Sequence, residues 1–231
     1  MPSLHLYGCW RSSASHRLQI GLRLKQLPFR YTPVCLDRGE QHSGWYKALN
    51  PRAEVPTLVV DGEPWVQTLA ILETLEETLQ ADSHPLLPSS MRERRICRAI
   101  AEHVNSSLQP LLLPARLRTP ILHAGREDAT TLTPALQAGV RDHQRHALTR
   151  LNAWLDGLPG PFCIGTKPTL ADVFVVPHLD ATRRLGLDLT PFKRLNDLHS
   201  LCRSVDAFAA AAPEQQPDAP GRNASSTTSP R

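Results

Sequence analysis

The sequence predicts an α/β domain at its amino-terminal end and an all-helical domain after it. Strand-like and helical segments alternate over about the first 80 residues, whereas only helical patterns follow the proline-rich stretch at residues 84–88. We therefore expect one domain over residues 1–83 and a second over residues 89–212. The remaining segment, residues 213–231, is rich in Pro, Ser, Thr and Gln with almost no apolar residues, and is predicted to be disordered.

The first domain begins with a strand–helix–strand unit. Residues Leu4–Tyr7 alternate as a short strand does, and residues Ser12–Gln26 carry the apolar positions of a partly buried helix. A second strand is expected at Phe29–Leu36, near a sheet edge because Pro33 interrupts it. The whole spans about 36 residues, which is the spacing of a βαβ unit.

A hairpin and a helix complete the first domain. Thr57–Val60 and Pro64–Val66 flank an Asp-Gly turn, a pair typical of tight hairpins. Thr68 is placed to cap a helix over Leu69–Leu79, whose leucines fall along one face. The predicted order is therefore βαβ followed by ββα.

The second domain is predicted to contain helices only. A long helix begins at Met91 and runs to Leu113, and a proline at 110 or 114 ends or kinks it. Thr169 and Asp172 have the spacing of a capping box, with Asp in the place of Glu. The other helices are expected at Leu136–Leu158, from Thr169 to about Gly186, at Pro191–Ser200 and at Arg203–Ala212.

The charge balance and hydropathy exclude several classes of protein. The 231 residues carry 26 basic and 22 acidic side chains, a net charge of +4, and no basic run of five or more, so a nucleic-acid surface is not expected. No apolar run approaches the roughly 20 residues that span a bilayer, and the amino terminus lacks the pattern of a signal peptide. We expect a cytoplasmic protein that binds small anions in a weakly positive cleft.

The cysteines and histidines show no pattern of a metal site. The five cysteines are scattered with no Cys-x-x-Cys pair, which indicates free thiols in a reducing compartment rather than a zinc site or a redox dithiol. The ten histidines show no ligand spacing either, and no Gly-rich phosphate loop is present. We expect no bound metal.

Hydroxyl side chains mark the turn between the first strand and the first helix. Ser12 and Ser13 stand where a helix exposes unpaired N–H groups and the positive end of its dipole, and Arg11 adds a positive charge beside them. A hydroxyl in this place can donate to a thiolate and lower its pKa. The alternative is that the serines only cap the helix.

Two further segments add binding groups. Val55 precedes Pro56, and a proline leading into a strand of a small sheet is often cis, leaving the preceding main chain open to pair with a peptide. Gln67 and Thr68 stand at a second helix start, which suits a carboxylate. An ordinary strand start and a simple cap are the alternatives. Together the three segments predict a site for a small peptide that carries two carboxylates and a thiol.

The order of these motifs resembles the zeta class of the glutathione S-transferase superfamily. The resemblance covers about residues 4–213. It rests on the motifs Arg11-Ser12-Ser13-x-Ser15-x-Arg17, Ala48-Leu49-Asn50-Pro51-x-x-x-Val55-Pro56, Gln67-Thr68-Leu69-Ala70-Ile71, Leu86-Leu87-Pro88, Leu170-Ala171-Asp172 and Leu187-Asp188-Leu189-Thr190-Pro191. It implies a thioredoxin-like first domain with a cis-proline, an all-helical second domain, glutathione as cofactor and a homodimer. The activity it implies is cis–trans isomerisation of a maleyl diketo acid, as in the maleylacetoacetate and maleylpyruvate isomerases.

The resemblance also implies a role for particular residues by position. Ser12 would face the glutathione sulfur and Ser13 would assist it. Arg11 and Arg184 would bind the carboxylates of a dianionic substrate, for which guanidinium groups are suited. The residues implied to hold glutathione are Ser12, Ser13, Gln41, Val55, Gln67, Thr68 and Gln109.

The chain departs from the family pattern at several positions. Ala14 replaces a cysteine and Thr68 replaces a serine, and Arg116 and Arg118 stand near a stretch where the maleylpyruvate branch carries arginines, without a clear alignment. A general glutathione transferase or dehalogenase acting on small electrophiles is an alternative function. A non-catalytic adaptor with the same fold is another, which the intact motifs around Arg11, Ser12 and Gln67-Thr68 argue against.

Overall fold

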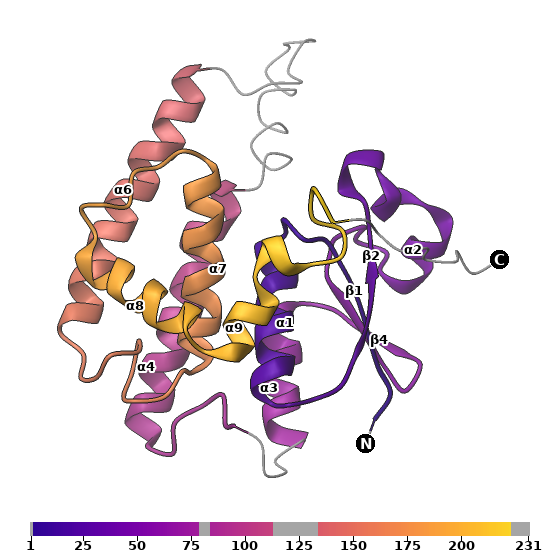
Figure 1. Cartoon of the computed structure of the whole chain (residues 1–231), viewed down its shortest axis with the longest axis horizontal. Helices are drawn as coiled ribbons and strands as arrows, with labels where there is room; N and C mark the ends of the chain where they lie inside the picture. The colour runs from indigo at the N-terminus through magenta and orange to yellow at the C-terminus, as the bar shows by residue number, and fades with distance from the viewer. Residues whose placement is uncertain (1, 79–83, 113–133, 223–231) are drawn as a thin grey trace. The chain divides into compact units, whose positions relative to one another are not determined.

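The computed structural model describes residues 2–78, 84–112 and 134–222, and these form two compact units (Figure 1). The first unit contains the described residues up to Leu87 together with those from Arg203 onward, and the second runs from Pro88 to Cys202. The first unit is therefore assembled from both ends of the chain.

A four-stranded mixed sheet forms the centre of the first unit. Its strands are β1 (Leu4–Gly8), β2 (Arg30–Pro33), β3 (Thr57–Val60) and β4 (Glu63–Trp65), in the spatial order β2-β1-β3-β4. Strand β1 runs parallel to β2 and antiparallel to β3, and β3 pairs with β4 as an antiparallel hairpin. The predicted βαβ–ββα order is confirmed.

Helices cover both faces of this sheet. Helices α1 (Ser13–Leu24) and α3 (Thr68–Thr78) lie together on one face, and α2 (Gly44–Leu49) lies on the other (Figure 1). The two helices approach closely at Gly21, where an added Cβ would stand 2.2 Å from Leu72 Cδ2. Apolar side chains from the sheet and from α1 and α3 fill the layer between them, among them the fully buried Leu6, Leu18, Leu22, Leu58 and Leu75.

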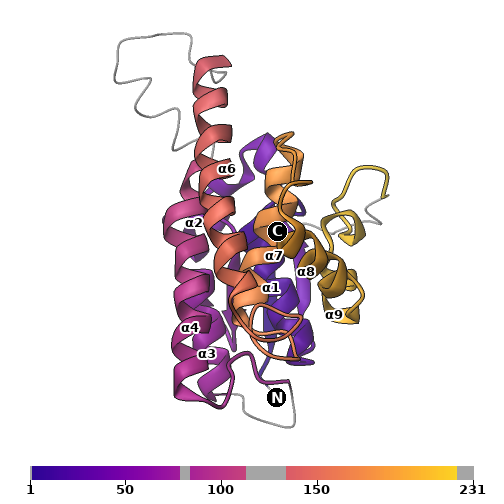
Figure 2. The same cartoon turned by 90° about the vertical axis from the view of Figure 1, so that its left-hand side faces the viewer.

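In the described residues of the second unit, every regular element is a helix. Its helices are α4 (Met91–Glu102), α6 (Pro134–Asp156), α7 (Leu170–Arg184) and α8 (Lys193–Arg203), and α6 runs alongside α4 (Figure 2). The expected capping box is present at the start of α7: the buried carboxylate of Asp172 accepts the N–H of Thr169 at 2.7 Å. Its other oxygen accepts the N–H of Cys163 at 2.8 Å, which fixes the preceding loop to the helix.

Two segments differ from the prediction. The long helix expected from Met91 changes its winding after Glu102, becoming the π-helix η3 (His103–Leu108) and then the 3-10 helix η4 (Gln109–Leu112). Between β2 and β3 the chain forms the short 3-10 helices η1 (Leu36–Arg38) and η2 (Glu40–His42) and then α2, none of which was predicted.

The carboxyl-terminal segment also departs from the predicted division. Helix α9 (Asp206–Ala211) packs against α1, and the 3-10 helix η5 (Pro213–Gln215) continues from it, so that residues 213–222 are part of the first unit. The prediction of disorder from residue 213 was wrong for these ten residues, because Pro213 and Ala219 are buried and the side chains of Gln216 and Asp218 form hydrogen bonds with main-chain groups. Among the described residues, no helix has both the length and the apolarity needed to cross a membrane.

Candidate functional site

The strand register places the predicted binding segments at one edge of the sheet. Tyr7, one residue before the end of β1, pairs with Thr57 at the start of β3, and Leu58 pairs with Trp65 at the end of β4. The turn that follows β1, the segment that precedes β3 and the segment that follows β4 therefore meet there. Strand β2 is parallel to β1 with Gly8 opposite Pro33, so the segment after β2 emerges at the same edge.

Ser12 is the residue that caps α1. Its backbone is extended, with φ −77° and ψ 116°, and its side-chain oxygen accepts the N–H of Ser15 at 3.2 Å. A serine hydroxyl can accept while it donates its own proton elsewhere. Ser13 follows as the first residue of the helix and is buried, with a relative exposure of 5%. The structure thus selects Ser12 from the two predicted caps, and leaves its hydroxyl proton available to a ligand at the positive end of the helix.

The loop before Ser12 is held by side-chain hydrogen bonds. The N–H of Cys9 donates to Ser15 Oγ at 3.2 Å, and the N–H of Ser12 donates to the carbonyl of Cys9 at 3.0 Å. Burial raises the pKa of the Cys9 thiol, which favours its protonated form.

Val55 is joined to Pro56 by a cis peptide bond, as predicted. It lies immediately before β3, and its main-chain N–H and C=O form no hydrogen bond with another described residue. Main-chain N–H and C=O groups without such a partner can form hydrogen bonds with an extended peptide, which then binds as an additional strand.

The segment at Gln67 and Thr68 differs in detail from the prediction. Gln67, not Thr68, is the capping residue, because its carbonyl accepts the N–H of Ile71 at 3.0 Å and α3 begins at Thr68. Gln67 has a φ of 70°, in the left-handed region that residues other than glycine rarely adopt. This backbone turn presents the exposed Gln67 side chain and the first N–H groups of α3 at the sheet edge, a suitable site for a carboxylate.

Arg11 and Gln41 lie in the two segments that flank Ser12. The guanidinium of Arg11 donates to Asp37 at 2.6 Å in an exposed ion pair. Gln41 belongs to η2, and its side-chain oxygen is buried and accepts no hydrogen bond from the described residues. Buried amide oxygens are normally satisfied, so a ligand donor is the natural partner of this one.

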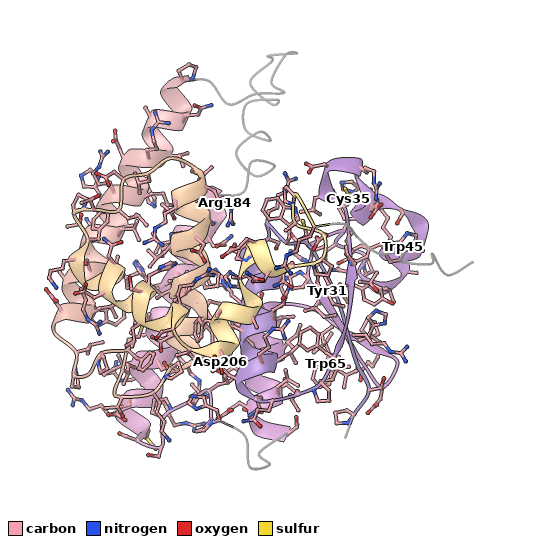
Figure 3. The ribbon with its side chains drawn as sticks, in the orientation of Figure 1. Tyr31, Cys35, Trp45, Trp65, Arg184 and Asp206 are labelled. Carbon is pink, nitrogen blue, oxygen red and sulfur yellow. The ribbon has the colours of Figure 1, made fainter. Side chains whose placement is uncertain are left out.

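The other predicted residues belong to the second unit or cannot be placed. Gln109 is buried at the junction of η3 and η4, and Arg184 is the exposed last residue of α7, labelled in Figure 3. Arg116 and Arg118 lie outside the described residues. No group of three or more metal-ligating side chains occurs in the part of the chain that the structure describes.

Asp218 was missed from the sequence. Its carboxylate accepts the N–H of Trp10 at 2.9 Å, two residues before Ser12, and the hydroxyl of Tyr31 at 3.2 Å. The only signal for it was a single acidic residue in a polar, proline-rich stretch, which composition alone assigns to disorder.

Comparison with known proteins identifies the family. Residues 11–78 match the family model of the glutathione S-transferase N-terminal domain. A maleylpyruvate isomerase of Ralstonia sp is 35% identical over 217 residues, which cover 93% of this chain and 99% of that protein. The holo structure of a bacterial zeta-class maleylpyruvate isomerase is 34% identical and has a TM-score of 0.83, covering 93% of this chain and 99% of that one. The chain belongs to the zeta-class glutathione S-transferase family.

A second solved relative carries ligands. The maleylacetoacetate isomerase of Methylobacterium extorquens AM1, solved with bound malonate and GSH, is 32% identical and has a TM-score of 0.84. The match covers 94% of this chain and 99% of that chain, so both units of this zeta-class protein have counterparts in it.

Proposed function

We propose that this protein is a glutathione-dependent isomerase that converts a maleyl diketo acid, maleylacetoacetate or maleylpyruvate, to its fumaryl isomer. The observation that carries the proposal is the meeting of Ser12, Val55 and Gln67 at one edge of the sheet. These are a hydroxyl at a helix start, an open main-chain edge and a second helix start. Relatives whose matches cover 93% or more of this chain bear the names of both isomerases.

The groups at this edge fit glutathione. The unpartnered amide oxygen of Gln41 and the open main chain of Val55 suit the peptide N–H and C=O groups of the tripeptide. The start of α3 at Thr68 suits its γ-glutamyl carboxylate. The Ser12 hydroxyl remains to face the sulfur.

The residues of the chain have separable tasks in the reaction. Ser12 donates a hydrogen bond to the sulfur and, with the dipole of α1, stabilises its anionic form. Arg11 and Arg184 bind the two carboxylates of the substrate through charge-assisted hydrogen bonds. Gln109 assists in holding glutathione, and Ser13 supports Ser12.

Glutathione supplies a thiolate that adds reversibly to the cis carbon–carbon double bond and leaves after rotation about the resulting single bond. No atom is gained or lost between substrate and product. The protein therefore needs no general base beyond the group that keeps the thiol ionised, and the reaction needs no metal or redox partner. This accounts for a site built from hydroxyls, amides and guanidinium groups.

The test is an isomerisation assay that offers maleylacetoacetate and maleylpyruvate in parallel. We expect turnover of at least one of them, dependent on added glutathione, measured by the loss of the enol absorbance. Glutathione binding without turnover of either acid would overturn the isomerase and favour a general transferase acting on small electrophiles. Absence of binding would favour an adaptor.

We further propose that the protein is a cytoplasmic homodimer. All five cysteines are free thiols, which suits a reducing compartment. Light scattering on the purified protein tests the dimer, and a monomeric mass would contradict it.

A further inference from the structure

The carboxyl-terminal segment is held on the first unit by specific contacts. Phe208 and Ala211 of α9 are fully buried, and α9 packs on α1. The chain then turns at Gln216, a buried residue whose side-chain amide donates to the carbonyl of Ala212 at 2.9 Å. These contacts bring Asp218, two residues later, to the loop between β1 and α1.

Asp218 uses both of its carboxylate oxygens. One accepts the N–H of Trp10 at 2.9 Å, and the other accepts the hydroxyl of Tyr31 at 3.2 Å. Burial and the nearby carboxylate raise the pKa of the Tyr31 phenol, so that it remains a donor. Tyr31 lies on β2, where Figure 3 labels it. The carboxylate therefore joins the loop before Ser12 to the neighbouring strand.

These contacts add to the hydrogen bonds within the loop that carries Ser12. Within the loop and the start of α1, Ser15 Oγ accepts the N–H of Cys9, and Ser12 donates its N–H to the Cys9 carbonyl. The N–H of Trp10 is the next donor along the chain, and its acceptor is the Asp218 carboxylate. Trp10 and Asp218 are 208 residues apart in the sequence, so this hydrogen bond ties the loop that carries Ser12 to a distant segment of the chain.

We propose that Asp218 is a positioning residue for Ser12, fixing the loop at Trp10 so that the hydroxyl points at the sulfur of bound glutathione. This rests on the proposed function for its catalytic consequence, but not for its effect on the loop. The carboxylate acts as an acceptor and not through its charge. A negative charge near the sulfur would disfavour a thiolate, so electrostatic activation cannot be its purpose.

The experiment uses the full chain and four variants. Asp218→Ala removes the acceptor. Asp218→Asn keeps an oxygen for the Trp10 N–H and offers an NH₂ to the Tyr31 oxygen, but removes the charge. Tyr31→Phe removes one of the two donors. Glu214→Gln is the matched control, because this exposed carboxylate lies in the same segment and forms an ion pair with Arg203.

The first readout needs no ligand. Hydrogen exchange of the amides between Cys9 and Ser13 should be faster in Asp218→Ala than in wild type by a factor of about ten or more. This factor corresponds to the free energy of the one hydrogen bond that the variant loses. Asp218→Asn and Glu214→Gln should exchange as wild type does, and Tyr31→Phe should lie between. Unchanged exchange in Asp218→Ala would overturn the inference, whatever the ligand of the protein is.

The second readout follows the glutathione thiol. In Asp218→Ala we expect the apparent pKa of the bound thiol to rise and turnover at neutral pH to fall about tenfold, with glutathione affinity changed less than turnover. Asp218→Asn should restore wild-type values. If Asp218→Asn is as impaired as Asp218→Ala, the charge matters and the inference fails. If Asp218→Ala does not fold, the Asn and Phe variants decide by the same two readouts. Wild-type protein without glutathione binding would refute the proposed function alone.

Discussion

Ser12 and Ser15 hold the start of α1 between them: Ser12 Oγ accepts the N–H of Ser15 at 3.2 Å, and Ser15 Oγ accepts the N–H of Cys9 at 3.2 Å. The two hydroxyls have different roles in this turn. Ser15 is completely buried and ties the loop to the helix, whereas Ser12 is half-buried and can face a ligand.

Ser12→Ala should separate the catalytic role of this hydroxyl from its capping role. We expect turnover to fall at least tenfold, because one donor to a developing charge is worth more than about 1.4 kcal/mol. The lost cap should also lower the free energy of unfolding by about 1 kcal/mol. Ser12→Thr, which keeps the hydroxyl, is the control for steady-state kinetics and denaturation. Wild-type turnover in a folded Ser12→Ala protein would rule out the catalytic role.

Arg184 and Arg183 are neighbours with different surroundings, which makes them a matched pair. Arg183 contacts His199 at 2.8 Å and Asn196 at 3.0 Å, both on α8, and so has a structural role. We expect Arg184→Ala to raise the KM for the maleyl acid about tenfold, by loss of a charge-assisted bond, while glutathione affinity stays the same. Arg183→Ala should leave both unchanged. An equal loss for both ligands in Arg184→Ala would contradict its assignment to the substrate.

Gln67 should show opposite effects on stability and binding. Its φ of 70° is unfavourable for glutamine and acceptable for glycine. Gln67→Gly should therefore keep the stability of the protein, or raise it by about 1 kcal/mol or less, while glutathione affinity falls. Gln67→Ala keeps the backbone cost and loses the same side chain, so it should bind as weakly without the gain. Calorimetry and denaturation distinguish the two, and unaltered glutathione affinity in both would remove Gln67 from the site.

Asp172 should be one of the most sensitive positions for stability. Its fully buried carboxylate accepts the N–H groups of Cys163 and Thr169 and the hydroxyl of Thr169. Asp172→Ala leaves these donors buried without an acceptor and should cost about 3 kcal/mol or more in the free energy of unfolding. Asp188→Ala removes an exposed carboxylate that also caps a turn, and should change the unfolding midpoint far less. Similar losses in the two variants would contradict this account.

His5 makes a prediction for the pH dependence of stability. Burial, and Arg30 opposite it on β2, lower its pKa from the usual value of about 6.5. The unfolded chain then binds more protons than the folded protein just below that pH, so stability falls as the pH drops through 6.5, the reference value for His5. His5→Asn keeps a partner for Thr32 Oγ1 and should flatten this dependence. Denaturation midpoints measured on both sides of this pH provide the check, and parallel curves for the two proteins would contradict it.

The parts of the site that rest on local patterns could be predicted from the sequence. A serine at a strand-to-helix turn predicts the cap at Ser12, and the Asp-Gly turn predicts the hairpin that brings the segment of Gln67, after β4, to the edge where Val55 precedes β3. The left-handed turn at Gln67 could not be predicted, because glutamine has no preference for it. The short helices between β2 and β3 were missed because they are too brief to show a period.

The position of Asp218 could not be predicted from amino-acid composition. Its segment contains too few apolar residues to predict packing, but Gln216 and Asp218 hold it through side-chain hydrogen bonds to main-chain groups. The partners of such bonds are main-chain groups that the tertiary structure leaves without another hydrogen bond. The local sequence around Gln216 and Asp218 therefore does not predict them.

The discontinuity of the first unit has a consequence for how the chain is divided. A fragment ending at Leu87 would contain every strand of the sheet, together with Ser12, Val55 and Gln67, but would leave exposed the face of α1 that α9 covers. Its Trp10 N–H would also lose the acceptor that Asp218 provides. During synthesis, the loop of Ser12 acquires this contact only after residue 218 has been made. Hybrids built by exchanging the amino-terminal part with a relative must therefore exchange residues 203–222 with it.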